Sequence, residues 1–330
     1  MGKRIAHITI TDFFTESGAY YPTIKLSYQF FGPDRADAPI VLVNHALTGN
    51  SEVTGENGWW KTLVGPEKCI DTNHYRILSF NIPGNGHTEE AGLIKQYKDF
   101  VARDMAKIFI RGLEHLKIQN LFAAIGGSLG GGIAWEIAAL EPNMIQHLIP
   151  IASDWKSSDW LIANCFLQER ILENSNQPIQ DARIHAMLCY RSPFSLKAKF
   201  QRTRHKEKDL FNTESWLLHH GEKLQERFQL AAYKLMNQLL KTIDITRGRE
   251  PLEKVVANIN STIHMISINT DVFFTAAENK ETFERLKHIK SNIYYDHIDS
   301  IHGHDAFLIE YEQLSLLLRN IFRVPSTSKV

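Results

Sequence analysis

The sequence predicts an α/β fold in which a mostly parallel central sheet carries an inserted helical lid. Short apolar stretches typical of buried strands alternate with amphipathic helical stretches through the first half of the chain. A glycine-flanked serine, Ser128, separates one such strand from the helix that follows it. Residues 155–245 then carry almost no strand pattern, although strands resume afterwards. We therefore assign residues 1–154 and 255–330 to the core and residues 155–254 to the lid.

Composition narrows the class of protein. The 330 residues include 37 Lys and Arg and 37 Asp and Glu, so a net charge of zero favours small-molecule partners over nucleic acid or an anionic membrane surface. The first residues lack the apolar core of a signal peptide, and no apolar run is long enough to span a bilayer. Three widely spaced cysteines argue against a disulfide framework and against a zinc cluster. We expect a cytoplasmic protein with reduced thiols and no bound metal.

The core elements follow from local patterns. Residues 5–32 alternate apolar and polar positions, which is typical of antiparallel edge strands, whereas residues 39–44 form a β-branched run typical of a central strand buried on both faces. Residues 99–116 carry apolar side chains at helical spacing and lead into the strand before Ser128. Further strands are predicted at residues 75–81, 147–153, 262–269 and 292–298, and residues 325–329 are predicted to be a disordered tail.

The strongest chemical signal is the sequence Gly126-x-Ser128-x-Gly130 between a strand and a helix. This is the nucleophile elbow of an α/β-hydrolase, in which a tight turn exposes the serine oxygen above the sheet. In that fold, an acid and a histidine follow the serine in chain order. Asp271 directly follows a predicted strand and His304 lies in the loop after the next one, so the sequence predicts a Ser128, Asp271, His304 triad.

Competing residues lie near two of the triad positions. His302 is only two residues from His304, and the sequence alone favours His304 without excluding His302. Asp296 and Asp299 are less suitable acids, because they lie on or after the strand that follows Asp271 and are therefore too close to the histidine loop.

Two backbone amides are candidates for the oxyanion hole. One belongs to Leu129, the residue after the serine, and the other to Leu47, in the loop after the strand at residues 39–44. Backbone donors suit this role because they are rigid and need no protonation state.

Several motifs occur together and in the same order as in one known family. Their sequences are HALTG at 45–49, GWW at 58–60, GP at 65–66, IDT at 70–72, GGSLGG at 126–131 and GHDAFL at 303–308, with QER at 168–170, AR at 182–183, YRS at 190–192 and ESWL at 214–217 in the lid. With these motifs the chain resembles the homoserine O-acetyltransferase family from about residue 40 to residue 315.

This resemblance implies a two-step acyl transfer. Ser128 would take the acetyl group of acetyl-CoA, a co-substrate rather than a bound cofactor, and the hydroxyl of homoserine would accept it with His304 as base. The resemblance also implies that Arg183 and Asp305 bind the amino-acid substrate, with Arg170 as the alternative to Arg183, and that two copies pair through their lid helices. Guanidinium and carboxylate groups suit the two charged ends of an amino acid.

The chain departs from the family pattern around the pocket. The loop after Asn81 is shorter than usual, the lid segment at residues 173–180 lacks the usual Asp-Pro and Gly-x-Tyr residues, and Gly131-Gly132-Ile133 replaces the usual continuation of the elbow. These changes leave the acceptor and the acyl donor open. Alternatives are an esterase that uses water, an acyltransferase that uses serine or succinyl-CoA, and a binding module with an idle serine.

Overall fold

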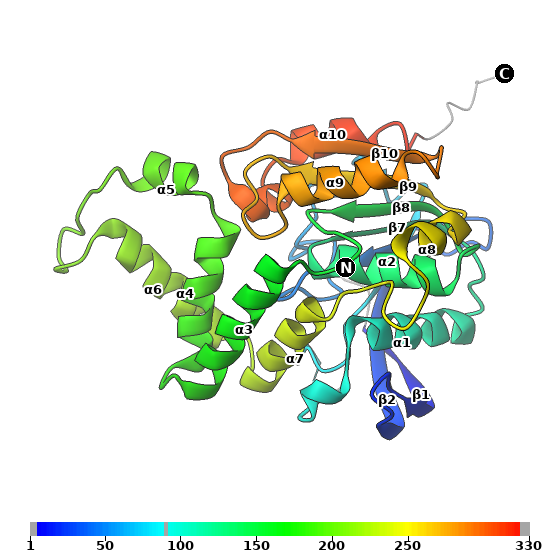
Figure 1. The fold of residues 1–330 in the computed structure, drawn as a ribbon, viewed down its shortest axis with the longest axis horizontal. Helices are drawn as coiled ribbons and strands as arrows, with labels where there is room; N and C mark the ends of the chain where they lie inside the picture. The colour runs from blue at the N-terminus through cyan, green and yellow to red at the C-terminus, as the bar shows by residue number, and fades with distance from the viewer. Residues whose placement is uncertain (1–4, 89–91, 324–330) are drawn as a thin grey trace.

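An eight-stranded sheet forms the core of the computed structural model, which describes residues 5–88 and 92–323 (Figure 1). The strand order is β1-β2-β6-β3-β7-β8-β9-β10. The strands β1 (Ala6–Phe14) and β2 (Tyr20–Phe31) are antiparallel to each other, and β2 is antiparallel to β6 (Arg76–Phe80). All other pairs of this sheet are parallel, as predicted, and join β6 to β3 (Ile40–Asn44) and then, in turn, β7 (Leu121–Gly127), β8 (Ile145–Ile151), β9 (Thr262–Ile268) and β10 (Ile293–Ile298).

Helices cover both faces of the sheet because its central strands are apolar on both sides. Helices α1 (Ala102–His115), α2 (Leu129–Leu140) and α9 (Ala276–Leu286) contribute to the core cluster on one face. Helix α10 (Tyr311–Leu318) packs on the other face with the aromatic rings of Trp60 and Phe307. A layered sheet of this kind brings the carboxyl ends of its parallel strands to one edge, which is where the candidate site lies.

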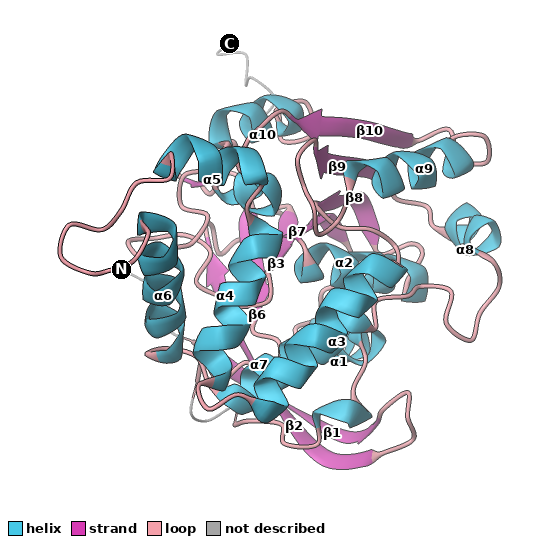
Figure 2. Ribbon diagram, turned by 60° about the vertical axis from the view of Figure 1, so that its left-hand side comes forward, coloured by secondary structure: helices cyan, strands magenta, loops and turns pink. Residues whose placement is uncertain are grey.

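The lid is helical, as predicted, and lies to one side of the sheet (Figures 1 and 2). Its helices are α3 (Asp159–Asn174), α4 (Pro178–Tyr190), α5 (Pro193–Phe200), α6 (Asn212–Gln225) and α7 (Leu230–Lys241). Helix α8 (Leu252–Asn258) follows and packs on α2 and α9 of the core. Helices α5 and α6 lie farthest from the sheet in Figure 1, beyond α4.

Two features differ from or add to the sequence prediction. The short strands β4 (Val64–Gly65) and β5 (Ile70–Asp71) pair with each other, and two residues are too few to give a recognisable pattern. The histidine motif forms a separate 3-10 helix, Gly303–Leu308, before α10 rather than the first turn of the last helix. The predicted disordered tail lies outside the described residues. Within the described ranges, none of the helices combines the length and the apolar character needed to cross a membrane.

Candidate active site

Ser128 occupies a strained turn between β7 and α2. Its backbone angles are φ 57° and ψ −126°, a region that residues with a Cβ atom rarely adopt. The Ser128 N–H donates to the carbonyl of Ile151 at 2.9 Å, and the Ser128 carbonyl accepts from the N–H of Gly131 at 2.9 Å. A Cβ atom on Gly130 would lie 2.3 Å from the carbonyl oxygen of Asn44, so only glycine fits beside this turn. The strained backbone conformation of Ser128 is therefore maintained by its two backbone hydrogen bonds and by the close packing of Gly130.

Asp271 and His304 come together at the ends of β9 and β10. Nδ1 of His304 donates to Oδ2 of Asp271 at 2.7 Å, which leaves Nε2 of the ring for another partner. The other carboxylate oxygen of Asp271 accepts from the N–H groups of Phe273 and Phe274 at 2.7 and 3.0 Å. These bonds fix the acid, and the acid fixes the tautomer and orientation of the imidazole.

Four aromatic rings surround the imidazole of His304, which is only 3% exposed. The ring of Phe274 is stacked on it at 5.8 Å between centroids, and those of Phe273, Tyr190 and Phe307 lie at 5.3, 5.5 and 5.7 Å. Phe307 also lies against Gly127, next to the serine, where a Cβ atom would come within 2.4 Å of the ring. The edge of Phe307 thus connects the histidine loop with the elbow.

The competing residues have other partners. The imidazole of His302 is 3.2 Å from a guanidinium nitrogen of Arg191 in the lid. Asp296 is exposed on β10, and Asp299 accepts a hydrogen bond from Asn269 at the surface. Of the candidates considered, the structure joins only His304 and Asp271.

The two candidate oxyanion amides are free to donate. Among the described residues, the N–H groups of Leu47 and Leu129 donate to no protein acceptor. Leu129 is the first residue of α2, where the orphan amides and the helix dipole favour negative charge. Both amides are thus available to an oxygen that develops charge above the serine.

His45 anchors the Leu47 loop, a role that sequence reasoning did not assign. Its Nδ1 donates to the carbonyl of Ala46 at 2.8 Å, and its Nε2 accepts from the N–H of Ile82 at 3.0 Å. Burial lowers the pKa of His45 to about 4, so the ring is neutral and this donor and acceptor pattern is fixed. The imidazole thereby ties the Leu47 loop to the shortened loop after Asn81.

The shortened loop is closed by side chains and packed against the lid. The carboxamide of Asn81 accepts from the Nδ2 group of Asn85 at 3.2 Å and donates to Ser51 at 3.0 Å. Gly84 has φ +86°, and a Cβ atom there would lie 2.6 Å from Leu235 of α7. The loop therefore leaves no space between the core and this lid helix.

Arg183 and Asp305 lie on the lid side of His304. The guanidinium of Arg183 is over the ring of Tyr190, 5.5 Å from its centroid, and that ring contacts His304. A carboxylate oxygen of Asp305 is 3.7 Å from the guanidinium of Arg191. Burial raises the pKa of Asp305, and the positive charge of Arg183 opposes this shift most strongly. The positive charge of Arg183 and the negative charge of Asp305 thus both lie near the imidazole of His304.

Arg170 does not share this position. It lies on the exposed side of α3, with its guanidinium 3.6 Å from the carboxylate of Glu173. Arg227, which no motif singled out, comes closer to the candidate site. It donates to the carbonyl of Thr48, one residue after Leu47, at 3.1 Å. Burial and the charge of Arg183 lower the pKa of Arg227, which indicates two neighbouring guanidinium groups.

Within residues 5–88 and 92–323, His, Cys, Asp and Glu side chains form no group of three or more that could hold a metal ion. The candidate site contains the groups that acyl-transfer chemistry needs: a serine on a strained turn, an oriented imidazole, two available amides and nearby charged side chains.

Comparison with known proteins identifies the family. Residues 39–174 match the family described as alpha/beta hydrolase fold. The chain is 30% identical to a homoserine O-acetyltransferase of Carboxydothermus hydrogenoformans over 95% of this chain and 93% of that protein. It is 32% identical to a homoserine O-acetyltransferase of Cyclobacterium marinum over 93% of this chain and 92% of that protein. The chain belongs to the homoserine O-acetyltransferase family.

Solved structures confirm the fold of this member of the homoserine O-acetyltransferase family. The homoserine O-acetyltransferase of Bacillus anthracis matches with a TM-score of 0.87 and 18% identity over 98% of both chains. The esterase E22 matches with a TM-score of 0.84 and 15% identity over 97% of this chain and 100% of that one. At these identities the likeness concerns the fold, and the predicted α/β-hydrolase class is confirmed.

Proposed function

We propose that this chain is an acyl-CoA-dependent O-acyltransferase that moves the acetyl group of acetyl-CoA to the hydroxyl of L-homoserine. The observation that carries the proposal is the 2.7 Å hydrogen bond from His304 to Asp271, at the sheet edge where Ser128 sits on its strained elbow. The names of relatives that match nearly the whole chain support the acetyl group and the homoserine acceptor.

In the first half-reaction, Oγ of Ser128 attacks the thioester carbon while Nε2 of His304 takes its proton. The amides of Leu47 and Leu129 hold the resulting oxyanion, and each such donor typically lowers the barrier by about 3 kcal/mol. The carbon–sulfur bond then breaks, CoA leaves with the proton from His304, and the acetyl group remains on Ser128.

In the second half-reaction, His304 takes the proton of the acceptor hydroxyl, whose oxygen attacks the acyl carbon. The same two amides hold the second oxyanion. The bond to Oγ breaks and the proton returns to Ser128, which completes a ping-pong cycle. The Asp271 carboxylate stays ionised and stabilises the imidazolium in both halves.

Charged side chains near His304 support an amino-acid acceptor in place of water. A guanidinium such as that of Arg183 binds a carboxylate through two parallel hydrogen bonds, and the carboxylate of Asp305 pairs with an ammonium. Arg183 lies over Tyr190 and Asp305 lies near Arg191, and the charges of Arg183 and His304 both act on Asp305, which supports a common location for the two groups. A simple ester hydrolase needs neither group.

Purified protein should release free CoA from acetyl-CoA over many turnovers only when homoserine is present, and O-acetylhomoserine should then appear in equal amount. Without homoserine, release should stop at about one CoA per serine, as the acyl-enzyme forms. Ser128→Ala should abolish both, whereas Ser315→Ala, on the far helix α10, should leave them unchanged. No CoA release in any combination of acetyl-CoA or succinyl-CoA with homoserine or serine would refute the acyltransferase function. Release with succinyl-CoA or serine alone would reassign the donor or the acceptor.

An esterase is the second candidate, because the esterase E22 and the acetyl esterase MekB match this fold over 97% of the chain. Hydrolysis of simple acetyl esters without any transfer to homoserine would favour it. The two candidates share the acyl-serine step and differ only in what attacks it.

We further propose that two copies pair through their lids. Large apolar side chains of the lid are exposed, and a groove of about 950 Å³ lies between α5 and the start of α6. Phe194, Phe200 and Phe211 line the groove, and a soluble monomer rarely exposes an apolar surface of this kind. Light scattering should give twice the chain mass, and Phe194→Asp should give the monomer. A monomeric wild type at micromolar concentration would contradict the pairing.

A cytoplasmic location fits the three cysteines, which carry no disulfide in the structure. Fractionation of the native cells should recover the transferase activity in the soluble cytoplasmic fraction.

A further inference from the structure

Two antiparallel segments join the lid to the core, and we call them the neck: residues 154–158 run outwards and residues 242–249 return. The N–H of Ser157 donates to the carbonyl of Ile243 at 2.9 Å, and the N–H of Ile245 donates to the carbonyl of Trp155 at 3.1 Å. Helices α3 to α7 all lie between these two segments in the chain. The neck is therefore the covalent connection between the whole lid and the core.

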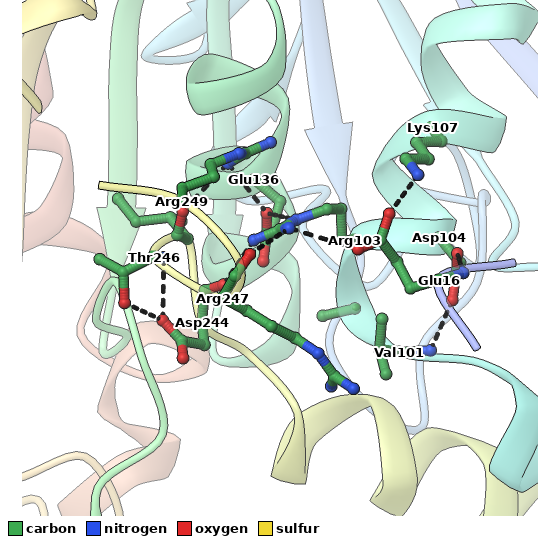
Figure 3. Close-up of polar contacts among 12 residues, drawn as sticks. Glu16, Val101, Arg103, Asp104, Lys107, Glu136, Asp244, Thr246, Arg247 and Arg249 are labelled. Atoms are coloured by element: carbon green, nitrogen blue, oxygen red, sulfur yellow. Dashed lines mark hydrogen bonds and ion pairs between the residues drawn. The ribbon is translucent and has the colours of Figure 1, made fainter. Parts of the chain in front are cut away.

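Arg103 of α1 and Glu136 of α2 hold the returning segment of the neck (Figure 3). The two terminal nitrogens of Arg103 donate to the carbonyls of Asp244 and Arg247 at 2.9 and 2.6 Å. Its Nε donates to a carboxylate oxygen of Glu136 at 3.0 Å. The side chains of Arg103 and Glu136 are only 6% and 1% exposed. One guanidinium thus connects a lid segment with two core helices.

Further charges surround this pair. Arg249 of the neck lies 3.7 Å from the same oxygen of Glu136, and Glu16 lies 3.3 Å from Arg103 and pairs with Lys107. Ionic groups are costly to bury, and apolar side chains would hold two surfaces together at least as well. A planar guanidinium, in contrast, fixes the position of the carbonyl groups that it binds. The cluster is therefore suited to fixing the position of the returning segment of the neck relative to the core helices.

The outgoing segment of the neck is held on its other side. The Asp154 carboxylate accepts from Asn279 and Thr282 of α9, each at 3.0 Å. The indole of Trp155 also donates to Thr282 at 3.1 Å. Helix α9 follows the loop of Asp271, as α2 follows Ser128. The neck therefore lies between the helices that follow two of the three candidate triad residues.

Close packing also joins the neck to the elbow helix. A Cβ atom on Gly132 would come within 2.4 Å of Ile243, so the neck touches the helix backbone one turn after Ser128. Glu136 lies one further turn along the same helix. A displacement of the neck would therefore move Arg183 and Arg227, both on the lid, relative to the serine.

We propose that Arg103 and Glu136 are positioning residues that set the lid over Ser128 and so decide whether the acyl group goes to the amino-acid acceptor or to water. The proposal rests on the proposed transferase function for its acceptor. Neither side chain touches substrate; both act through the neck.

Glu136→Gln and Arg103→Lys test this, because each keeps a polar side chain of similar size while weakening the clamp. Two rates are measured: transfer from acetyl-CoA to homoserine, and hydrolysis of p-nitrophenyl acetate, which needs only the serine, the histidine and the amides. We expect the transfer-to-hydrolysis ratio to fall about tenfold or more through a raised KM for homoserine, since small misplacements of binding groups are costly. Ester hydrolysis should stay within about threefold of wild type.

Glu253→Gln is the matched control, because Glu253 accepts two hydrogen bonds from Arg285 in an exposed ion pair outside the neck. It should leave the ratio unchanged. If Glu136→Gln lowers transfer and hydrolysis in equal proportion, the residues are merely structural and the proposal is wrong. If single variants fail to fold, the apolar double variant Arg103→Met with Glu136→Leu replaces them, since it removes both charges of the buried pair together, while Glu16 keeps its pairing with Lys107 and Arg249 is partly exposed.

Amide hydrogen exchange separates this proposal from the proposed function. In Glu136→Gln, exchange should become faster in α3 and α7 of the lid and stay unchanged in β7 and β8. This readout holds even if wild type proves to be an esterase without any homoserine transfer. Unchanged exchange in α3 and α7 would overturn the positioning role whatever the substrate is.

Discussion

At the scale of single residues, the imidazole of His304 is the best-defined group of the candidate site. Its one ring hydrogen bond goes to Asp271, and aromatic rings fill the space around it. Because Asp271 also accepts two backbone N–H groups, its carboxylate cannot turn without losing them. The acid therefore acts by holding one tautomer of the histidine.

Asp271→Asn should lower kcat for acetyl transfer by about 10⁴-fold, because an amide in this position favours the wrong histidine tautomer. Steady-state release of CoA measures the effect. The control Asp299→Asn changes an exposed carboxylate that accepts from Asn269 and should leave kcat unchanged. A loss of less than tenfold in Asp271→Asn would show that another group orients His304.

Arg183→Lys should raise KM for homoserine by about tenfold or more, because an ammonium cannot form the two parallel hydrogen bonds of a guanidinium. The hydrolysis of a small acetyl ester should change little, since it needs no carboxylate clamp. Arg170→Lys is the matched control, because Arg170 pairs with Glu173 on the exposed side of α3. An equal effect of both substitutions would count against a binding role for Arg183.

At the scale of elements, the elbow depends on how closely α2 approaches the neighbouring strands. Gly126 and Gly130 face each other across the turn, and Gly130 also touches the backbone of β3. The same contact positions the loop that carries Leu47. The first turns of helix α2 are thus placed by close backbone contacts, which explains the unusual glycine content of the helix.

Gly130→Ala should destabilise the protein although alanine favours helices by about 1 kcal/mol over glycine. The new Cβ atom would lie 2.3 Å from the carbonyl oxygen of Asn44, and backbone cannot yield as a side chain can. The midpoint temperature of thermal unfolding and the rate of ester hydrolysis should both be lower than in wild type. Gly65→Ala, whose Cβ atom would meet the flexible side chain of Lys68 at 3.3 Å, should be tolerated. Equal stability of the two variants would contradict this account.

The sequence was sufficient for the strands of the eight-stranded sheet and for proposing the order of the candidate triad, because strand and helix periodicity and the glycine-rich elbow are local patterns. Other features depend on contacts between distant segments. The hydrogen bond from Arg227 to Thr48 spans 179 positions, and the one from Ile82 to His45 spans 37. Local patterns carry no trace of such pairs. For the same reason, the hydrogen bond from Arg103 to the carbonyl of Asp244 could not be predicted from the sequence.

At the scale of the whole molecule, two partly buried histidines couple folding to pH. His147 on β8 and His264 on β9 contact each other at 3.2 Å, and burial lowers the pKa values of both, that of His264 to about 4. The unfolded chain binds protons at these sites near pH 6.5, whereas the folded chain binds them only at lower pH. Folding stability therefore rises with pH between about 4 and 6.5 and is complete above that window.

The free energy of unfolding, measured by urea titration, should be lower at pH 5 than at pH 7.5. Each unit of difference between the folded and unfolded pKa values changes the free energy of unfolding by at most about 1.4 kcal/mol, and by less for groups that are partly exposed. His264→Gln, which cannot take a proton, should make the loss between the two pH values smaller. His297→Gln changes an exposed histidine and should leave the loss as in wild type. An unaltered pH dependence in His264→Gln would rule out this histidine pair as a cause.

The four rings around His304 also make this residue a spectroscopic reporter. Ring currents from stacked and edge-on neighbours at 5.3 to 5.8 Å displace the resonances of imidazole protons, and the chain has 15 histidines from which His304 would stand apart. The Tyr190 ring belongs to the lid, whereas the three phenylalanines belong to the core. The resonance of His304 should therefore follow the distance between lid and core in solution, without any label attached to the protein.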